Sequence, residues 1–288
     1  MQINLIINML NGPNNYSSTL TKNDGSIERY SIIGTFLKDS LGMPRYSNEY
    51  AEVVIHEYNH SFCNPLIDKH YEELKNSALK MFRVVLKTIK KYNYRSEKSM
   101  LYETLVRANV IRYAYSNWGE EKAKHLMCKD MFKGFIIIDE VVDLLSIYEN
   151  NREKYPILDS FMPEITNLFD SLNYEKIKTE YENNCGNIIK TSFDNFKRKV
   201  STNTEIIIYF DKPMDINTEK CKTYIKSENT QKIMYNKITW AKTNKSECTI
   251  NIDLEPNTEY KLMFSGFFFM TENYFPLSKN YELDFKTK

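Results

Sequence analysis

The spacing of the apolar residues changes near Val200, and this change constrains the fold more than any other feature of the sequence. Before it, apolar residues recur at helical spacing, most clearly from Tyr71 to Tyr92. After it, apolar and polar residues alternate, as from Cys248 to Leu254 and from Tyr281 to Phe285. A period near 3.6 indicates amphipathic helices, and a period of two indicates half-buried strands. We therefore expect an α+β protein with a mainly helical part followed by an all-β part.

The N-terminal part is expected to hold a small sheet followed by helices. Residues 1 to about 45 read as strand, loop and strand around the turn cluster Asn11–Asn15. A helix is expected from Glu49 to Phe62, with Asn48 as its cap and Pro65 as its end. Four more helices are expected, at Ser96 to Tyr115, Glu120 to Phe132, Gly134 to Asn150 and Ile157 to Leu172.

The alternating segments after Val200 are separated by short turns such as Glu255-Pro256-Asn257. Repeated short strands of this kind fit a β-sandwich of the immunoglobulin type. We place one domain at residues 1–190 and a second, Ig-like domain at residues 200–288. The 39 basic and 38 acidic residues leave no excess charge that would favour nucleic acid. No apolar run reaches the roughly 18 residues that span a bilayer, so the chain is not expected to cross a membrane.

The segment His56-Glu57-Tyr58-Asn59-His60 is the strongest chemical motif in the chain. Residues four apart lie on one face of a helix, so the two imidazoles can hold one Zn²⁺. Glu57 then stands beside the first ligand, where a carboxylate can take a proton from an activated water. Apolar residues around the motif predict a largely buried helix, in which unpaired histidines would be costly. The sequence therefore predicts a zinc site with His56 and His60 as ligands and Glu57 as the general base.

A catalytic zinc needs a third protein ligand and an open position. The extended form of the motif is excluded, because Cys63 and Leu66 stand where it requires Gly and His. We favour Glu103, since it lies on an apolar stripe where a carboxylate needs a cation. An ion pair between Glu103 and Arg107, four residues apart, is the alternative. The rival ligands are His70, Asp139, Glu140 and Cys63.

Two further features are candidates for contacts with substrate. The segment from Leu5 to Tyr16 could form an edge strand that pairs with an extended peptide. Arg112 and Tyr113 follow Glu103 on the same expected helix and are candidates for stabilising an oxyanion. For both residues, a surface or packing role is the competing interpretation.

Residues 54–65 and 102–108 resemble a bacterial domain-of-unknown-function family, as does the Asn11–Tyr16 segment. Members of that family are regarded as zinc peptidases of the gluzincin kind, with two histidines and one glutamate as ligands. The resemblance spans roughly residues 1 to 180 and implies a zincin-like fold, with His56, His60 and Glu103 as ligands and Glu57 as the base. Residues 205–215 are similar to the opening of bacterial Ig-like domains of the S-layer-protein type.

The expected function is therefore zinc-dependent hydrolysis of a peptide or protein substrate. An inactive zincin fold that serves as a binding or adhesion module is the alternative. A purely structural zinc site is disfavoured, because such sites use four protein ligands. The resemblances imply a secreted or cell-surface protein, with the Ig-like domain facing a cell-surface partner. The first ten residues look like a strand and contain no signal peptide, which leaves the cytoplasm as the alternative location.

Overall fold

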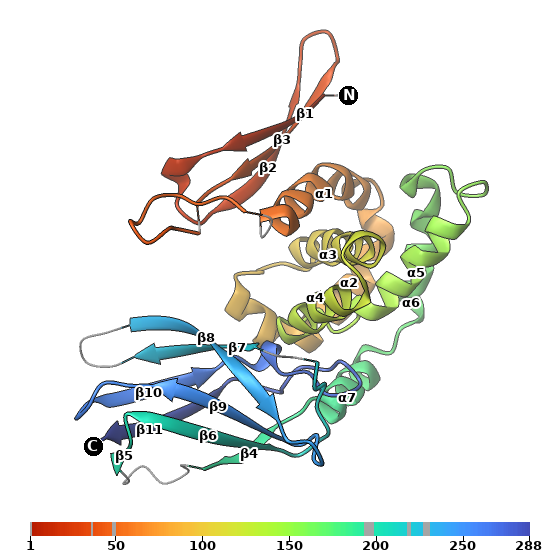
Figure 1. The fold of residues 1–288 in the computed structure, drawn as a ribbon. Coiled ribbons are helices and arrows are strands. Elements are labelled where there is room, and N and C mark those ends of the chain that lie inside the picture. Colours follow the sequence, from red (N-terminus) through yellow and green to blue (C-terminus); the bar gives the residue numbers. More distant parts are fainter. Residues whose placement is uncertain (1, 36, 48–49, 193–198, 218–219, 227–230) are drawn as a thin grey trace. The chain divides into compact units, whose positions relative to one another are not determined.

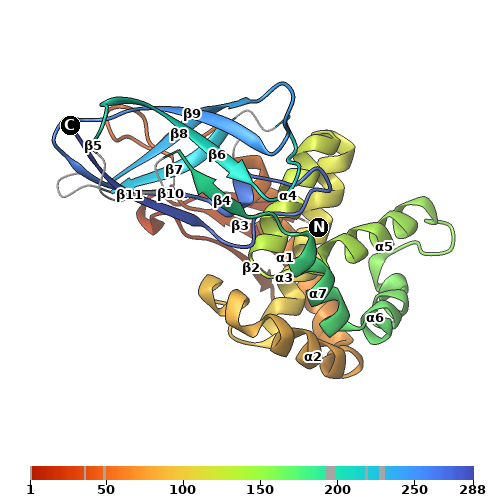
Figure 2. The ribbon, with the colours of Figure 1, turned by 90° about the horizontal axis from the view of Figure 1, so that it is seen from below.

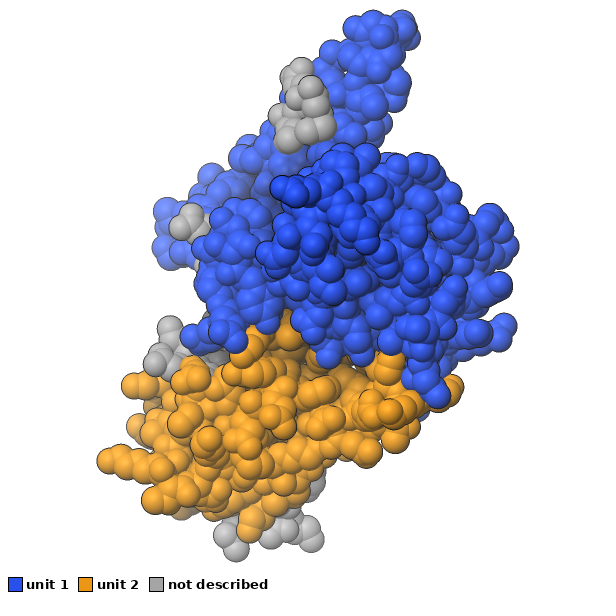
Figure 3. Space-filling model, turned by 90° about the vertical axis from the view of Figure 1, so that its right-hand side faces the viewer, with its two compact units in different colours: residues 1–123, 137–174 blue, residues 124–136, 175–288 orange. Residues whose placement is uncertain are grey.

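A computed structural model describes residues 2–35, 37–47, 50–192, 199–217, 220–226 and 231–288 (Figure 1). The chain forms two compact units: residues 1–123 with 137–174, and residues 124–136 with 175–288 (Figure 3). The first unit combines a small sheet with helices, and the second holds the β-strands that follow. The α+β class is therefore confirmed. The predicted domain boundary between residues 190 and 200 stays a prediction, since this division follows contacts and places two helical segments with the strands.

The first unit begins with a three-stranded sheet in the order β1-β3-β2. Its strands are β1 (Gln2–Ile7), β2 (Asn15–Thr21) and β3 (Ile27–Ile33). Strand β3 runs parallel to β1 and antiparallel to β2. The prediction of one edge strand from Leu5 to Tyr16 is wrong. The 3-10 turn Met9–Asn11 divides that segment, because the Asn8 side chain caps the turn and Gly12 takes a φ of +57°.

Seven helices of the described residues follow, and most lie where the apolar spacing predicted them. They are α1 (Tyr50–Lys69), α2 (Tyr71–Ile89), α3 (Glu97–Asn117), α4 (Glu120–Phe132), α5 (Ile138–Asn150), α6 (Met162–Ser171) and α7 (Tyr174–Asn184). Ser96 caps α3 as predicted, since its hydroxyl accepts from the Ser99 amide. Helix α5 begins later than predicted because Gly134 has a φ of +107°, outside the helical region. The predicted cap Asn48 lies outside the described residues, and α7 was not predicted.

Helix α1 continues through Pro65, so the prediction that it ends there is wrong. A proline inside a helix leaves the carbonyl four residues earlier without its amide donor. Here that carbonyl belongs to Ser61, and the Arg29 side chain of β3 donates to it at 3.4 Å. The Arg29 guanidinium also lies 4.7 Å from the centre of the Phe62 ring. This tertiary contact supplies a donor that the helix itself lacks.

Helix α3 lies at the centre of the helical layer and packs against α1, α2 and α5 (Figure 2). Its buried side chains include Leu101, Leu105 and Ile111. Helix α1 in turn packs against β2 and β3. The predicted burial of α1 was too high, because most of its residues are half-buried and Phe62 is 38% exposed. Among the described residues, no helix is both long and apolar enough to cross a membrane.

The second unit is a β-sandwich built from one continuous series of paired strands. Its strands are β4 (Ile188–Thr191), β5 (Lys199–Val200), β6 (Asn203–Phe210), β7 (Lys220–Lys226), β8 (Gln231–Trp240), β9 (Glu247–Asp253), β10 (Glu259–Phe264) and β11 (Tyr281–Thr287). The first part of β8, residues 231–237, pairs with β7, and its last part, residues 238–240, pairs with β9. Strand β8 therefore passes from the sheet that contains β7 to the sheet that contains β9. The pairing is antiparallel except between β11 and β5.

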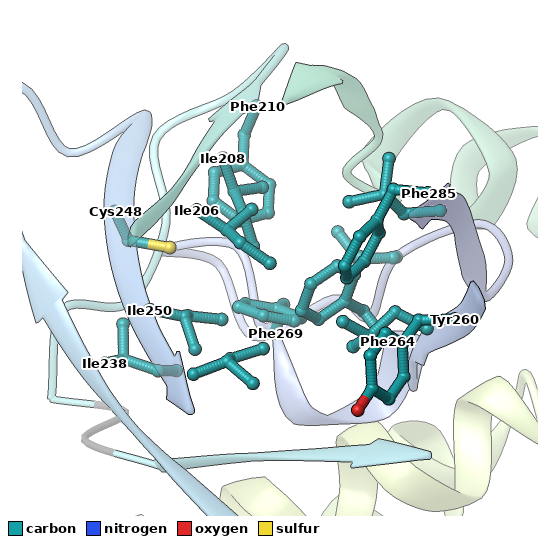
Figure 4. Packing of buried hydrophobic residues seen from close by; sticks show 14 of the residues in the cluster. Ile206, Ile208, Phe210, Ile238, Cys248, Ile250, Tyr260, Phe264, Phe269 and Phe285 are labelled. Atoms are coloured by element: carbon teal, nitrogen blue, oxygen red, sulfur yellow. The ribbon is translucent and has the colours of Figure 1, made fainter. Parts of the chain in front are cut away.

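Alternating residues of the strands fill the core of the sandwich (Figure 4). Ile206, Ile208 and Phe210 of β6 are buried, and their sequence neighbours are more exposed. They meet buried residues of β9, β10 and β11, among them Ile250, Phe264 and Phe285 (Figure 4). Burial of one face of β6, β9, β10 and β11 is what the period of two predicted.

The C-terminal part of α4 packs on the short 3-10 turn Gly266–Phe268 of the same unit. The rings of Phe132 and Phe267 lie 6.0 Å apart, and those of His125 and Phe268 lie 5.9 Å apart. A Cβ at Gly266 would lie 2.6 Å from the Phe132 ring and 2.8 Å from a backbone oxygen. Glycine is therefore required for this close approach.

Candidate metal centre

His56, His60 and Glu103 are brought together where α1 packs against α3. The two Nε2 atoms of the histidines lie 3.1 Å apart. The Glu103 carboxylate faces both rings, with Oε1 3.4 Å from His60 Nε2 and Oε2 3.6 Å from His56 Nε2. All three side chains are half-buried, with exposed fractions of 18%, 14% and 14%. The site is thus shielded from bulk water without being sealed.

These separations test whether the three side chains fit a zinc ion. With ligand atoms about 2.0–2.2 Å from zinc, two corners of a tetrahedron lie roughly 3.3–3.6 Å apart. The two histidine nitrogens lie 3.1 Å apart and Glu103 Oε1 lies 3.4 Å from His60 Nε2, both close to that edge, while the other carboxylate oxygen, Oε2, makes the 3.6 Å approach to His56. Two imidazole nitrogens and one carboxylate oxygen are also the ligand set of many catalytic zinc sites. The residues therefore fit the ion, while their role as ligands stays a prediction.

Asn64 fixes the orientation and the tautomer of the His60 ring. Its Oδ1 lies 3.1 Å from His60 Nδ1, one helical turn further along α1. An amide oxygen only accepts, so Nδ1 carries a proton. Burial lowers the pKa of His60, but the hydrogen bond and charge of Glu103 outweigh burial and raise it, so the metal-free ring can also donate from Nε2 to Glu103. When Nε2 loses that proton, its lone pair points toward Glu103 and His56. A metal-binding histidine commonly has such a partner on its other nitrogen.

The Glu103 carboxylate is held in its ionised form. Burial raises its pKa, but the hydrogen bond to His60 and the charges of Arg107 and His56 outweigh burial, so the pKa lies well below its ordinary value. Arg107 lies 2.8 Å from Oε2. The ion pair named as the alternative interpretation of Glu103 is therefore present, and it coexists with the approach to both histidines.

Glu57 is nearly buried, with an exposed fraction of 7%, in the same helical turn as the two histidines. Burial raises the pKa of its carboxyl group to about 7, with His60 lowering it and Glu103 raising it further. Both His60 and Glu103 belong to the site, so Glu57 lies within its electrostatic reach. A divalent cation held nearby would favour the ionised carboxylate.

Two rival ligands have other partners in the structure. The ring nitrogens of His70 lie 3.1 Å from an oxygen of Asp159 and 3.2 Å from an oxygen of Glu73. Cys63 is buried, and burial raises the pKa of its thiol to about 12. A thiol that stays protonated near neutral pH is a poor metal ligand. Within the described part of the chain, no other three acidic, histidine or cysteine side chains gather as closely as the three of this site.

The other rivals, Asp139 and Glu140, lie in the first turn of α5. One buried oxygen of each carboxyl group lacks a hydrogen-bond partner. Burial, followed by the hydrogen bond to Asp139, raises the pKa of Glu140 to about 9. Glu140 is therefore protonated in the folded chain near neutral pH and ionised in the unfolded one.

We expect Glu140→Gln to stabilise the protein at pH 8. An acid whose pKa is raised in the fold binds more protons folded than unfolded, so its contribution to stability is lost as the pH rises from about 4.5 toward about 9. Glutamine removes that loss, and a gain of about 4 kcal/mol at pH 8 should shrink to less than about 1 kcal/mol near pH 5. Thermal unfolding of both forms across this range measures it, with the exposed Glu153→Gln as control. A gain that does not depend on pH would contradict this origin.

Arg112 and Tyr113, the candidates for an oxyanion contact, have partners away from Glu103. Arg112 is paired with Glu149 of α5, with Nη2 2.5 Å from Oε2. Tyr113 is 41% exposed, and its ring packs edge-on against Trp118 at 5.2 Å. The ion pair of Arg112 and the ring packing of Tyr113 agree with the surface and packing roles, which were the alternative to an oxyanion contact.

Sequence reasoning missed two residues that contact the site. Asn64 lies four residues after His60, a spacing that places the two on one helix face and could have been read from the sequence. Tyr94 comes from the segment before α3, and its hydroxyl lies 3.2 Å from Glu103 Oε2. No local spacing links Tyr94 to the motif, because the connection exists only once α3 is packed.

Two family models match the chain. One, described as a domain of unknown function (DUF4932), covers residues 1–168 and so includes the whole site. The other, described as a bacterial Ig-like domain, covers residues 184–287 and matches the sandwich. The resemblance to a domain-of-unknown-function family and to bacterial Ig-like domains is thereby confirmed at that level. A comparison with curated proteins finds no match.

Solved structures give only distant similarities. The first domains of the surface layer protein SbsC are 13% identical, with a TM-score of 0.29, over 88% of this chain and 35% of that one. The N-terminal part of SbsC is 15% identical, with a TM-score of 0.28, over 83% and 58% of the two chains. Alpha-2-macroglobulin of E. coli is 14% identical, with a TM-score of 0.27, over 38% and 6%. The chain thus spans less than two thirds of each of these structures.

Proposed function

The chain belongs to the DUF4932 family of domains of unknown function, and from the site that this family's region contains we propose that it is a zinc-dependent peptidase with a zincin-like fold of the gluzincin kind. The approach of His56, His60 and Glu103 to one another supports this proposal most directly. Two imidazole nitrogens and a carboxylate that faces both of them, beside a second, buried carboxylate, are the parts that metal-assisted hydrolysis needs.

The residues of the chain divide the work of the proposed reaction. Zinc, once bound, would supply Lewis-acid activation of water and of the scissile carbonyl. His56, His60 and Glu103 would hold the ion and leave one side open. Glu57 would accept the proton of the attacking water and return it to the leaving amine. Its near-complete burial keeps solvent from competing for that proton.

Strand β2 offers a place for an extended substrate. It is an edge strand of the sheet and packs against α1. In an antiparallel pair, only every second residue of a strand exchanges backbone hydrogen bonds with the partner strand. At the two ends of β2, the Gly34 amide donates to the Asn14 carbonyl and the Lys22 amide donates to the Ser26 carbonyl, so the even-numbered residues of β2 are those bonded to β3. The amide and carbonyl of Ser17 therefore face away from β3. Ser17 pairs with Ser31 of β3. The Ser31 hydroxyl lies 3.5 Å from the carbonyl oxygen of Val54, which is two residues before His56 in α1.

We expect Ser17→Pro to lower kcat/KM for peptide substrates by about tenfold, the effect of losing one to two strand hydrogen bonds. Proline removes the outward-facing amide, and it is tolerated on the free side of an edge strand. Ser17→Ala, which keeps the amide, should retain the activity. Steady-state kinetics on a fluorogenic peptide, with zinc content measured in parallel, tests this. Equal activity of the proline and alanine variants would exclude peptide binding along this edge.

We also propose that the protein acts outside the cell or on its surface, with the Ig-like domain contacting a surface partner. The match of residues 184–287 to a bacterial Ig-like domain supports this. Fractionation of a bacterium that expresses the chain in its native context tests the location. Recovery only from the cytoplasm would contradict it.

The deciding experiment for the proposed function joins metal analysis of the purified full chain with digestion of a peptide library. One zinc per chain together with cleavage supports a peptidase. Zinc without cleavage of any peptide would instead favour a binding or adhesion module on an inactive zincin fold. Absence of zinc binding would overturn both.

A further inference from the structure

The two oxygens of the Glu103 carboxylate have different surroundings. Oε1 faces His60, with its Nε2 at 3.4 Å. Oε2 lies 2.8 Å from Arg107 Nη2 and 3.2 Å from the Tyr94 hydroxyl, and it is 3.6 Å from His56 Nε2. Each carboxylate oxygen has two lone pairs. Arg107 and Tyr94 can therefore occupy both lone pairs of Oε2, which leaves those of Oε1 available.

Arg107, Tyr94 and Glu103 form a closed triangle of hydrogen bonds. Arg107 Nη2 also donates to the Tyr94 hydroxyl at 2.8 Å. A guanidinium only donates and a carboxylate only accepts, so the Tyr94 hydroxyl must accept from Arg107 and donate to Glu103. The chemistry of the three groups thus permits one arrangement of the protons. The side chains of Arg107 and Glu103 are 12% and 14% exposed, which limits competition by water.

We infer that Arg107 and Tyr94 are positioning residues that hold Oε2 of Glu103 and present Oε1 as the metal ligand. This inference rests on the proposed zinc site. It adds which oxygen binds and what orients it, because a carboxylate with one oxygen fully bonded to protein can offer only the other to a metal. Partners of this kind preorganise a ligand before the metal arrives, and losing one commonly costs about 10- to 100-fold in metal affinity.

Tyr94→Phe tests the inference with little change of shape. We expect zinc affinity, measured on the full chain by competition with a chromogenic chelator, to fall about tenfold, and Arg107→Gln to lower it by about 10- to 100-fold. Tyr102→Phe and Arg112→Gln are matched controls, because they remove the same groups from α3 side chains bonded to Asp68 and Glu149. Both controls should bind zinc like the wild type. Arg107→Lys, which keeps the charge, should recover part of the loss.

Co²⁺ provides a second readout that a general loss of stability would not change. Release of Oε2 lets both oxygens of Glu103 reach the metal, and the higher coordination number should weaken the visible absorption of the Co²⁺ form of Tyr94→Phe. Wild-type zinc affinity and an unchanged Co²⁺ spectrum in both Tyr94→Phe and Arg107→Gln would overturn the inference while the zinc site itself stands.

A wild-type chain that binds zinc but cleaves nothing would refute the peptidase and leave the inference intact. A wild-type chain that binds no zinc would overturn both.

Discussion

Glu57→Gln is expected to lower peptide hydrolysis on the order of a thousandfold while zinc remains bound. Glutamine has the shape of glutamate but cannot accept a proton from water near neutral pH. The proposed ligands His56, His60 and Glu103 are untouched, so metal affinity should stay within a few-fold of the wild type. Because Glu57 is nearly buried, replacing its carboxyl group with a neutral amide should also leave the fold at least as stable.

The measurement pairs the turnover of a fluorogenic peptide with the zinc content of the same sample. Glu52→Gln is the matched control, since Glu52 lies in the first turn of α1 and pairs with Lys122 at the surface. It should keep both activity and zinc. Hydrolysis by Glu57→Gln at the wild-type rate would mean that another group accepts the proton. Loss of zinc from this variant would mean that Glu57 supports the ion instead.

The local part of the site could be predicted because it depends on one helix. Residues 56 and 60 share a helix face whatever the rest of the chain does. Strands β1 and β3, the helices that precede α5 and the later strands with clear alternation were likewise visible in the spacing of apolar residues, whereas β2 was not predicted. The proposed third ligand could only be chosen by its chemistry, because its approach depends on how α3 packs against α1. Glu103 makes the ion pair with Arg107 and also approaches both histidines, while its role as a metal ligand stays a prediction.

The failures arise where tertiary contacts override local rules. Pro65 would end an isolated helix, yet Arg29 of β3 supplies a donor to the carbonyl that it leaves unpaired. The same applies to Tyr94, which reaches Glu103 only in the packed structure. Strands β7 and β8 were not predicted because lysines and other polar residues interrupt their alternation. Helix α7 was missed because it is polar and has one buried residue, Tyr174.

Glu103→Ala is expected to weaken zinc binding on the order of a thousandfold, more than the loss of a residue that only orients a ligand. Two imidazoles alone leave a zinc ion with half of its tetrahedral ligands from protein. The variant also removes the negative charge that pairs with Arg107, so the Arg107 guanidinium would then face the cation without a counter-charge. This repulsion adds to the loss of the ligand and should be weaker at high ionic strength.

Glu103→Gln separates these two effects, because the amide keeps an oxygen at the site but not the charge. Its zinc affinity should lie between those of the wild type and Glu103→Ala, and the difference from wild type reports the electrostatic share. Glu97→Ala is the control on the same helix, since Glu97 bonds to Tyr71 and lies in the first turn of α3. Chelator competition measures all four forms. Zinc affinity of Glu103→Ala equal to that of the wild type would remove Glu103 from the site, and the geometry would then describe an ion pair between Glu103, Arg107 and protonated histidines.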